Sequence, residues 1–171
     1  ATHGFWQLRL KQSNIRKTAF RTPTCLYQWR VLPFGLSNSP VVFQRAMSSV
    51  FQKEYTKPDG SKVTALGSFV QVYMDDILIY SRTAEEHLAH LNFVFKALME
   101  HGFFLNPKKC EFNKPEVRFL GHIVSREGCK VCPLKVKTME EWPVPTTGQE
   151  MYSFLGFANY FRLFIRDFAT I

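Results

Sequence analysis

The chain contains two segments in which apolar residues recur every three to four positions, the spacing of a helix with one buried face. The first starts at Ser39, a suitable N-cap, with Pro40 at the first helical position. Its predicted buried stripe consists of Val42, Phe43, Ala46, Met47 and Val50. We therefore expect an amphipathic helix over residues 39–52.

The second segment, residues 82–102, carries helix signals at both ends. Thr83 and Glu86 form a capping box, and Gly102 is a typical residue at which a helix ends. The predicted buried face of this helix consists of Leu88, Leu91, Phe95 and Leu98.

Other segments alternate apolar and polar residues or are almost continuously apolar, as strands are. Residues 6–10 predict one strand, and residues 17–22 and 25–34 predict two more, joined at Pro23. Residues 69–80 predict a strand, a two-residue turn and a second strand.

The remaining segments complete the predicted order. Residues 54–67 are polar and predict a loop or an exposed hairpin, and residues 105–125 predict short strands. A short helix is expected near residues 135–142, and a last helix over residues 147–169 opens with a second capping box. This order predicts an α+β fold with helices on one side of an antiparallel sheet and a separate C-terminal helical lobe.

The positive charge is concentrated in the first third of the chain. The formal net charge is +8, and residues 1–53 contain eight Lys or Arg and no Asp or Glu. A polyanion such as nucleic acid is the natural partner of such a segment. A basic surface kept only for solubility is the alternative. No run of about 18 apolar residues occurs, so we expect no membrane partner.

The four cysteines do not define a site. Only Cys129 and Cys132 have a spacing typical of metal ligands, and a structural zinc ion needs four ligands. Cys110 and His122 are the candidates for the other two. We expect ordinary reduced thiols of an intracellular protein, and a zinc-organised domain is the less favoured reading.

Asp75 and Asp76 lie side by side at the predicted tip of the hairpin over residues 69–80. Two such charges repel by roughly 4 kcal/mol at an effective dielectric constant near 20. Asp is common in turns, so closing the hairpin is the simpler explanation. Binding of a divalent cation is the other, because carboxylates are natural ligands of Mg²⁺ and a phosphate completes the shell.

Five segments, in order along the chain, resemble segments of reverse transcriptases. Residues 73–76 (YMDD) resemble the Tyr-x-Asp-Asp box, and residues 32–47 resemble the Leu-Pro-x-Gly, Ser-Pro and Phe-Gln segment. Residues 17–22 resemble a fingers strand, residues 110–125 the region leading to the primer grip, and residues 154–165 the thumb helix. The chain thus resembles the reverse transcriptase domain of a gypsy-class LTR retrotransposon or retrovirus-like Pol polyprotein, as a fragment.

The resemblance implies a right-hand polymerase core of the α+β class. A palm with partial fingers would span residues 1–125, with the fingers strands at about residues 9–35, and the thumb would span residues 126–171. The implied reaction is RNA-directed DNA synthesis, in which the primer 3′-hydroxyl attacks the α-phosphate of a dNTP. Two Mg²⁺ or Mn²⁺ ions would bind the attacking and leaving oxygens.

The resemblance also assigns roles residue by residue. Asp75 and Asp76 are the implied catalytic residues and metal ligands. The implied nucleotide-binding residues are Gly4, Phe5, Phe34, Gly35, Tyr73 and Met74. The implied primer grip consists of Phe119, Leu120, Gly121 and His122. The implied phosphate contacts are Arg9, Lys11, Arg16, Lys17 and Arg21.

Two of these positions carry a further expectation. Phe5 matches the bulky residue that excludes a ribose 2′-hydroxyl, although a core aromatic is the simpler reading of a Phe there. The third metal ligand of the family, an Asp, aligns immediately before Ala1, and the first acid of the chain is Glu54. We therefore expect a polymerase parent and a weak or inactive 171-residue fragment.

The resemblance implies an RNA template, a DNA primer and dNTPs as partners, with RNase H and integrase domains in the same polyprotein. The implied location is the cytoplasm, within virus-like particles. The alternative function is a non-catalytic domain that binds RNA or an RNA–DNA hybrid, from a decayed or domesticated element.

Overall fold

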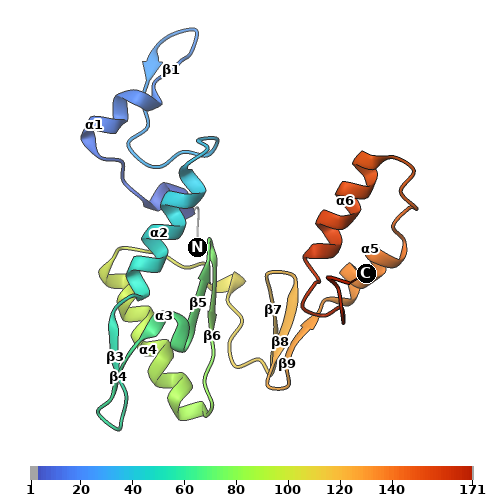
Figure 1. Ribbon diagram of the computed structural model, residues 1–171. Helices are drawn as coiled ribbons and strands as arrows, with labels where there is room; N and C mark the ends of the chain where they lie inside the picture. Colours follow the sequence, from blue (N-terminus) through green and yellow to red (C-terminus); the bar gives the residue numbers. More distant parts are fainter. Residues whose placement is uncertain (1–3, 171) are drawn as a thin grey trace. The chain divides into compact units, whose positions relative to one another are not determined.

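The computed structural model describes residues 4–170, and the chain forms two compact units that divide after Cys110. Both units contain helices and antiparallel strands, which confirms the predicted α+β class (Figure 1). This division does not decide where a palm ends and a thumb begins, so the border between residues 125 and 126 stays a prediction. No helix within residues 4–170 is long and apolar enough to cross a membrane.

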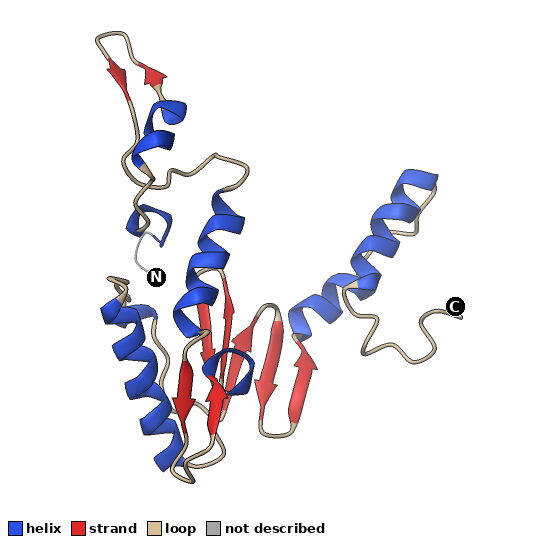
Figure 2. Cartoon of the chain, turned by 60° about the vertical axis from the view of Figure 1, so that its left-hand side comes forward, coloured by secondary structure: helices blue, strands red, loops and turns tan. Residues whose placement is uncertain are grey.

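The first unit contains three antiparallel hairpins and two long helices (Figure 2). Its elements are η1 (Gly4–Gln7), α1 (Gln12–Ile15), η2 (Arg16–Thr18), β1 (Phe20–Arg21), β2 (Leu26–Tyr27), α2 (Ser39–Phe51), β3 (Glu54–Thr56), β4 (Lys62–Thr64), α3 (Ala65–Ser68), β5 (Val70–Tyr73), β6 (Asp76–Ile79), α4 (Ala84–Glu100) and η3 (Pro107–Lys109). The hairpins are β1–β2, β3–β4 and β5–β6, as the sequence predicts, although β1 and β2 are shorter than expected.

The core of this unit lies between α2, α4 and β5. The predicted stripe of α2 is confirmed at Phe43, Met47 and Val50, which are buried. The predicted buried face of α4 is wrong at two positions, because Leu88 is 63% exposed and Phe95 is 39% exposed. The prediction is confirmed at Leu98, which is buried together with Val94 and Ala97.

The starts of the two long helices differ in detail from the prediction. Asn38, and not Ser39, occupies the N-cap of α2. Ser39 is buried, and its hydroxyl donates a 2.8 Å hydrogen bond to the carbonyl of Pro33. In α4, the Thr83 hydroxyl accepts from the backbone N–H of Glu86, as predicted. The hydrogen bond of Ser39 to Pro33 links the start of α2 to the loop before it.

The strand predicted over residues 6–10 is wrong. Residues 4–7 form the 3₁₀ helix η1, and beyond it only Arg9 makes a bridge, to Val31. The Gln7 side chain donates to the carbonyl of Phe104 at 3.1 Å and accepts from its N–H at 2.8 Å. The Gln7 side chain thus bonds to both backbone groups of Phe104, and residues 4–10 contribute no strand to a sheet.

The second unit contains a three-stranded antiparallel sheet followed by two helices. Its elements are β7 (Glu116–Phe119), β8 (His122–Ser125), β9 (Gly128–Val131), α5 (Pro133–Glu140) and α6 (Gly148–Asn159). The capping box of Thr147 and Glu150 is confirmed, but α6 ends at Asn159 rather than near residue 169. Strand β9 was not predicted, because residues 128–131 were interpreted as part of a series of turns.

Candidate active site

The two adjacent acids lie on the β5–β6 hairpin. The predicted strand–turn–strand is confirmed, but Tyr73 pairs with Asp76, so the turn consists of Met74 and Asp75, and Asp76 is the first residue of β6. Met74, the first residue of the turn, has a φ of 53°, in the left-handed region. Glycine is the usual residue in this region, so Met74 adopts its conformation at a steric cost.

Gln44 of α2 holds this turn in place. Its Oε1 accepts a 2.6 Å hydrogen bond from the backbone N–H of Met74, and its Nε2 donates to the carbonyl of Val72 at 3.1 Å. The same Nε2 donates its other hydrogen to the Ser48 hydroxyl at 3.1 Å. The side chain of Gln44 thus fixes the backbone immediately before Asp75.

Gly4 packs directly against Asp75. A Cβ placed on Gly4 would collide with Oδ1 of Asp75 and would lie 3.0 Å from Cζ of Phe43. Gly4 is buried, and the hydrogen in place of a side chain is what lets the carboxylate occupy this position. Two residues assigned separately from the sequence, Gly4 and Asp75, are therefore neighbours in the structure.

Phe5, the residue after Gly4, contacts Phe34, another predicted nucleotide-binding residue. The ring of Phe5 lies 5.0 Å from that of Phe34 and 5.3 Å from that of Phe43. Phe5 is only partly buried, whereas Phe34 is exposed. The contact joins the start of the chain to the loop before α2, next to the Asp75 turn. Gly35, with a φ of 89°, continues this loop.

A row of aromatic rings extends from this point into the β1–β2 hairpin. Successive ring centroids lie 5.8 to 6.3 Å apart along the order Phe34, Trp6, Trp29, Phe20 and Tyr27. Four of these side chains are exposed, and Trp29 is partly buried. The five basic residues of the predicted phosphate contacts are exposed on the same segment: Arg9, Lys11, Arg16, Lys17 and Arg21. Exposed rings beside basic side chains suit a single-stranded nucleic acid.

The carboxylates of Asp75 and Asp76 have the chemistry that Mg²⁺ or Mn²⁺ requires. Both residues are exposed, and both offer hard oxygen donors. Among residues 4–170, no group of three or more His, Cys, Asp or Glu side chains lies close enough to hold a metal ion. The carboxylates of Asp75 and Asp76 therefore fit the role of two ligands within a larger set. Cys129 and Cys132 likewise have no such group around them in this part of the chain.

The predicted primer grip lies in the second unit, in the turn between β7 and β8. Phe119 pairs with His122, and Leu120 and Gly121 form a two-residue turn between them.

No sequence pattern pointed to Gln44, although this residue lies in the segment that carries the resemblance. No sequence pattern pointed to Trp6, Trp29 or the role of the aromatic row either.

A hairpin that presents two adjacent carboxylates offers oxygen ligands for divalent cations, and comparison with known families gives the class of protein. Residues 1–124 match the family described as reverse transcriptase (RNA-dependent DNA polymerase). The chain therefore belongs to the reverse transcriptase family. This confirms the family that the sequence motifs predict.

The curated relatives are retrovirus-related. The chain is 39% identical over 168 residues to the Pol polyprotein from transposon 297 and 36% identical over 168 residues to that from transposon gypsy, both of Drosophila melanogaster. These matches cover 98% of this chain but only 15% of each relative. The chain thus spans a small part of the proteins it resembles.

Solved structures of foamy viral protease–reverse transcriptase share the fold. One, in complex with double-stranded DNA, has a TM-score of 0.77 and 29% identity and covers 98% of this chain and 27% of its own. Another, in complex with an RNA/DNA hybrid, has a TM-score of 0.68 and 30% identity and covers 93% of this chain and 20% of its own.

Proposed function

We propose that this chain is the core of an RNA-directed DNA polymerase that adds dNTPs to a primer 3′-hydroxyl. The observation that carries the proposal is the position of Asp75, in a turn fixed by Gln44 and in contact with Gly4. A ligand needs such a fixed position if it is to hold a cation between an attacking and a leaving oxygen. Membership of the reverse transcriptase family supports the same reaction.

Asp75 and Asp76 would hold divalent cations, Mg²⁺ or Mn²⁺, two in number. When bound, these ions supply charge stabilisation for in-line phosphoryl transfer. The protein's own contribution is to fix the two carboxylates at the hairpin and to orient the substrates around them. Tyr73, whose backbone pairs with that of Asp76, presents an exposed ring beside the pair.

The incoming dNTP would lie against Phe5 and Phe34, whose rings contact each other beside the Asp75 turn. The bulky ring of Phe5 would exclude a ribose 2′-hydroxyl there, which is the basis of the proposed preference for dNTPs. Gly4, Gly35, Tyr73 and Met74 complete the proposed nucleotide site. The Phe119–His122 turn would hold the primer, and the aromatic row with its basic neighbours would hold the RNA template.

Primer extension on an RNA template with dNTPs and Mg²⁺ tests the proposal. It is measured for the 171-residue chain and for a longer Pol polypeptide that contains it, because the chain spans only 15% of the Pol relatives it matches. We expect extension by the longer form and little or none by the shorter one. Absence of extension in the longer form would contradict the proposal. Salt-sensitive RNA binding without extension would favour the alternative, a non-catalytic binding domain.

Gln44 provides a second test. Replacing Gln44 by Met removes the hydrogen bonds to Met74 and Val72 and preserves the volume, so the turn that carries Asp75 loses its anchor. We expect primer extension to fall by ~10- to 100-fold, because small displacements of catalytic groups are costly. The free energy of unfolding should fall by only about 1–3 kcal/mol, since two partly buried backbone groups lose their partners.

The control for this change is Gln71→Met, at an exposed position of β5 in the same hairpin. Extension rates and urea unfolding curves are compared for both variants and the parent. An unchanged extension rate in Gln44→Met would show that the side chain does not fix the turn.

We infer that the parent is a Pol polyprotein with RNase H and integrase domains that acts in the cytoplasm within virus-like particles. The similarity to Pol polyproteins of Drosophila transposons supports this inference.

A further inference from the structure

The turn that joins β7 to β8 has an unfavourable backbone conformation. Leu120 and Gly121 have φ values of 50° and 78°. Positive φ at both central residues is the pattern of a type I′ turn, for which Asn-Gly is the preferred sequence. A leucine adopts the left-handed conformation at a steric cost, so contacts outside the hairpin are needed to favour it.

Tyr160, the residue after α6, supplies such contacts within the same unit. Its hydroxyl donates a hydrogen bond to the carbonyl oxygen of Leu120. Its ring stacks on that of His122, with the centroids 5.0 Å apart and the planes 5° apart. One side chain therefore binds both the turn and the first residue of the strand that follows it.

Lys135 of α5 lies at the same place. Its Nζ is 3.8 Å from the centroid of the Tyr160 ring, a cation–π contact. A Cβ on Gly121 would lie 2.7 Å from this Nζ and 2.8 Å from the Tyr160 hydroxyl oxygen. Within the described part of the chain, no carboxylate lies within ion-pair distance of Lys135. The turn therefore has the ammonium group of Lys135 beside its backbone.

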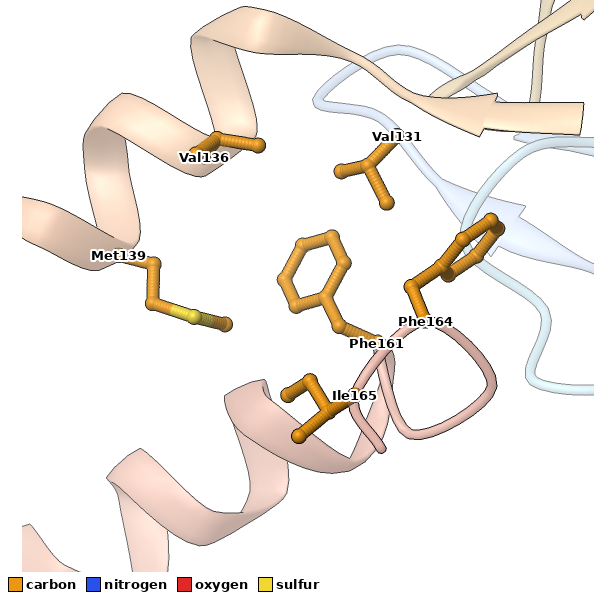
Figure 3. Close-up of a pocket in the computed structure, with 6 residues that line it drawn as sticks. All are labelled: Val131, Val136, Met139, Phe161, Phe164 and Ile165. Carbon is orange, nitrogen blue, oxygen red and sulfur yellow. The ribbon is translucent and has the colours of Figure 1, made fainter. Parts of the chain in front are cut away.

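The segment that carries Tyr160 is anchored by apolar packing. Phe161, the next residue, is only 3% exposed, and the ring of Phe164 lies 5.4 Å from that of His122. Figure 3 shows Phe161, Phe164 and Ile165 of this segment beside Val131 of β9 and Val136 and Met139 of α5. These six side chains line a cavity of about 260 Å³. This packing fixes the backbone from which Tyr160 reaches the turn.

We propose that Tyr160 is a positioning residue for the primer grip and that Lys135 binds a phosphate of the primer strand there. Tyr160 holds the Leu120 carbonyl and hence the conformation of the turn. Lys135, held over the Tyr160 ring, presents its ammonium group beside Gly121. This inference rests on the proposed function, because the turn needs these properties only if it holds a primer.

Tyr160→Phe tests the positioning role, since it removes the hydroxyl and keeps the stacked ring. In the longer polymerase polypeptide that includes this chain, we expect the single-turnover rate constant of extension to fall by ~3- to 10-fold, the equivalent of about one net hydrogen bond. The KM for dNTP and the burst amplitude should be unchanged. Amide hydrogen exchange at Gly121 and His122 should be faster in the variant.

The matched control is Tyr152→Phe, because Tyr152 lies on α6 and is 80% exposed. It should change neither the rate constant nor the exchange. A Tyr160→Phe variant with unchanged exchange at the turn would overturn the positioning role. A loss of burst amplitude with a normal rate constant would also overturn it, since that result indicates fewer folded molecules rather than a misplaced primer.

Lys135→Gln tests the phosphate contact. The slope of the logarithm of the primer–template binding constant against the logarithm of salt concentration should decrease in magnitude by about one. Lys135→Arg should restore the slope. The control is Lys137→Gln on the same helix. The Nζ of Lys137 lies 3.6 Å from Oε1 of Glu141, so its charge already has a partner. An unchanged slope in Lys135→Gln would remove Lys135 from the grip.

The two proposals fail in different ways. A longer polypeptide without any extension would overturn the proposed function. Normal extension by the parent, together with normal exchange and rate constant in Tyr160→Phe, would overturn only the present inference.

Discussion

Replacing Asp75 by Asn is expected to reduce Mg²⁺-dependent primer extension by at least ~100-fold, the scale of losing one preorganised electrostatic group. The amide has almost the same size as the carboxylate but no charge, and it is a poor ligand for Mg²⁺. The loss cannot be relieved by a small movement of the hairpin. The turn is fixed by Gln44 on one side and borders Gly4 on the other.

The measurement is single-turnover extension by the longer polypeptide, with RNA binding measured in parallel. Binding should be retained, because removing a negative charge does not weaken attraction to a polyanion. The control is Asp59→Asn, at the exposed tip of the β3–β4 hairpin. If Asp75→Asn kept more than about a tenth of the parent rate, Asp75 would not be a metal ligand, since ligand loss should cost more than this.

The parts of the fold that the sequence predicted are those determined by local patterns. The β5–β6 hairpin follows from two apolar runs separated by two residues, but its turn is Met74–Asp75, one residue earlier than the gap between the runs. Helix α2 is a similar case, since Phe43, Met47 and Val50 lie on one face in any helix that includes them. In α2, local spacing and burial agree at these three positions, whereas Val42 of the predicted stripe is 44% exposed.

The failures have causes that lie far away in the sequence. Residues 6–10 alternate as a strand would, but Gln7 bonds to the backbone of Phe104 and the segment does not extend a sheet. In α4, the apolar residues cover more than one face, so the sequence did not decide which face packs. The side chain of Leu88 is exposed, whereas that of Ala97 is buried.

The candidate site was predictable only in part for the same reason. Asp75 and Asp76 are adjacent in the chain, so their pairing needed no knowledge of the fold. The contacts that give Asp75 its position come from Gln44, thirty residues before Met74, and from Gly4 at the start of the chain. The same holds for the β7–β8 turn, where the contact with Tyr160 spans 40 residues. Such contacts need the three-dimensional structure.

Gly4→Ala should therefore affect activity more than stability. The new methyl group would collide with the carboxylate of Asp75 and would lie 3.0 Å from the ring of Phe43. The ring belongs to the core, whereas the carboxylate can rotate, so the carboxylate should move. We expect extension to fall by ~10- to 100-fold from misplacement of the ligand. The free energy of unfolding should fall by about 1–3 kcal/mol at most.

Gly156→Ala is the matched control for this change. Gly156 lies within α6, and no atom lies within 4 Å of the position that its Cβ would occupy. The control should leave extension unchanged and stabilise the protein by roughly 0.5–1 kcal/mol, because alanine favours the helix. Rates and urea unfolding are measured on both variants. A Gly4→Ala variant with the parent's rate would mean that the contact between Gly4 and Asp75 does not position the carboxylate. Equal fractional losses of folded protein and of activity would mean that Gly4 acts on folding alone. Activity lost from a fully folded variant would identify the absent side chain at Gly4 as the reason that Asp75 can take its place in the turn.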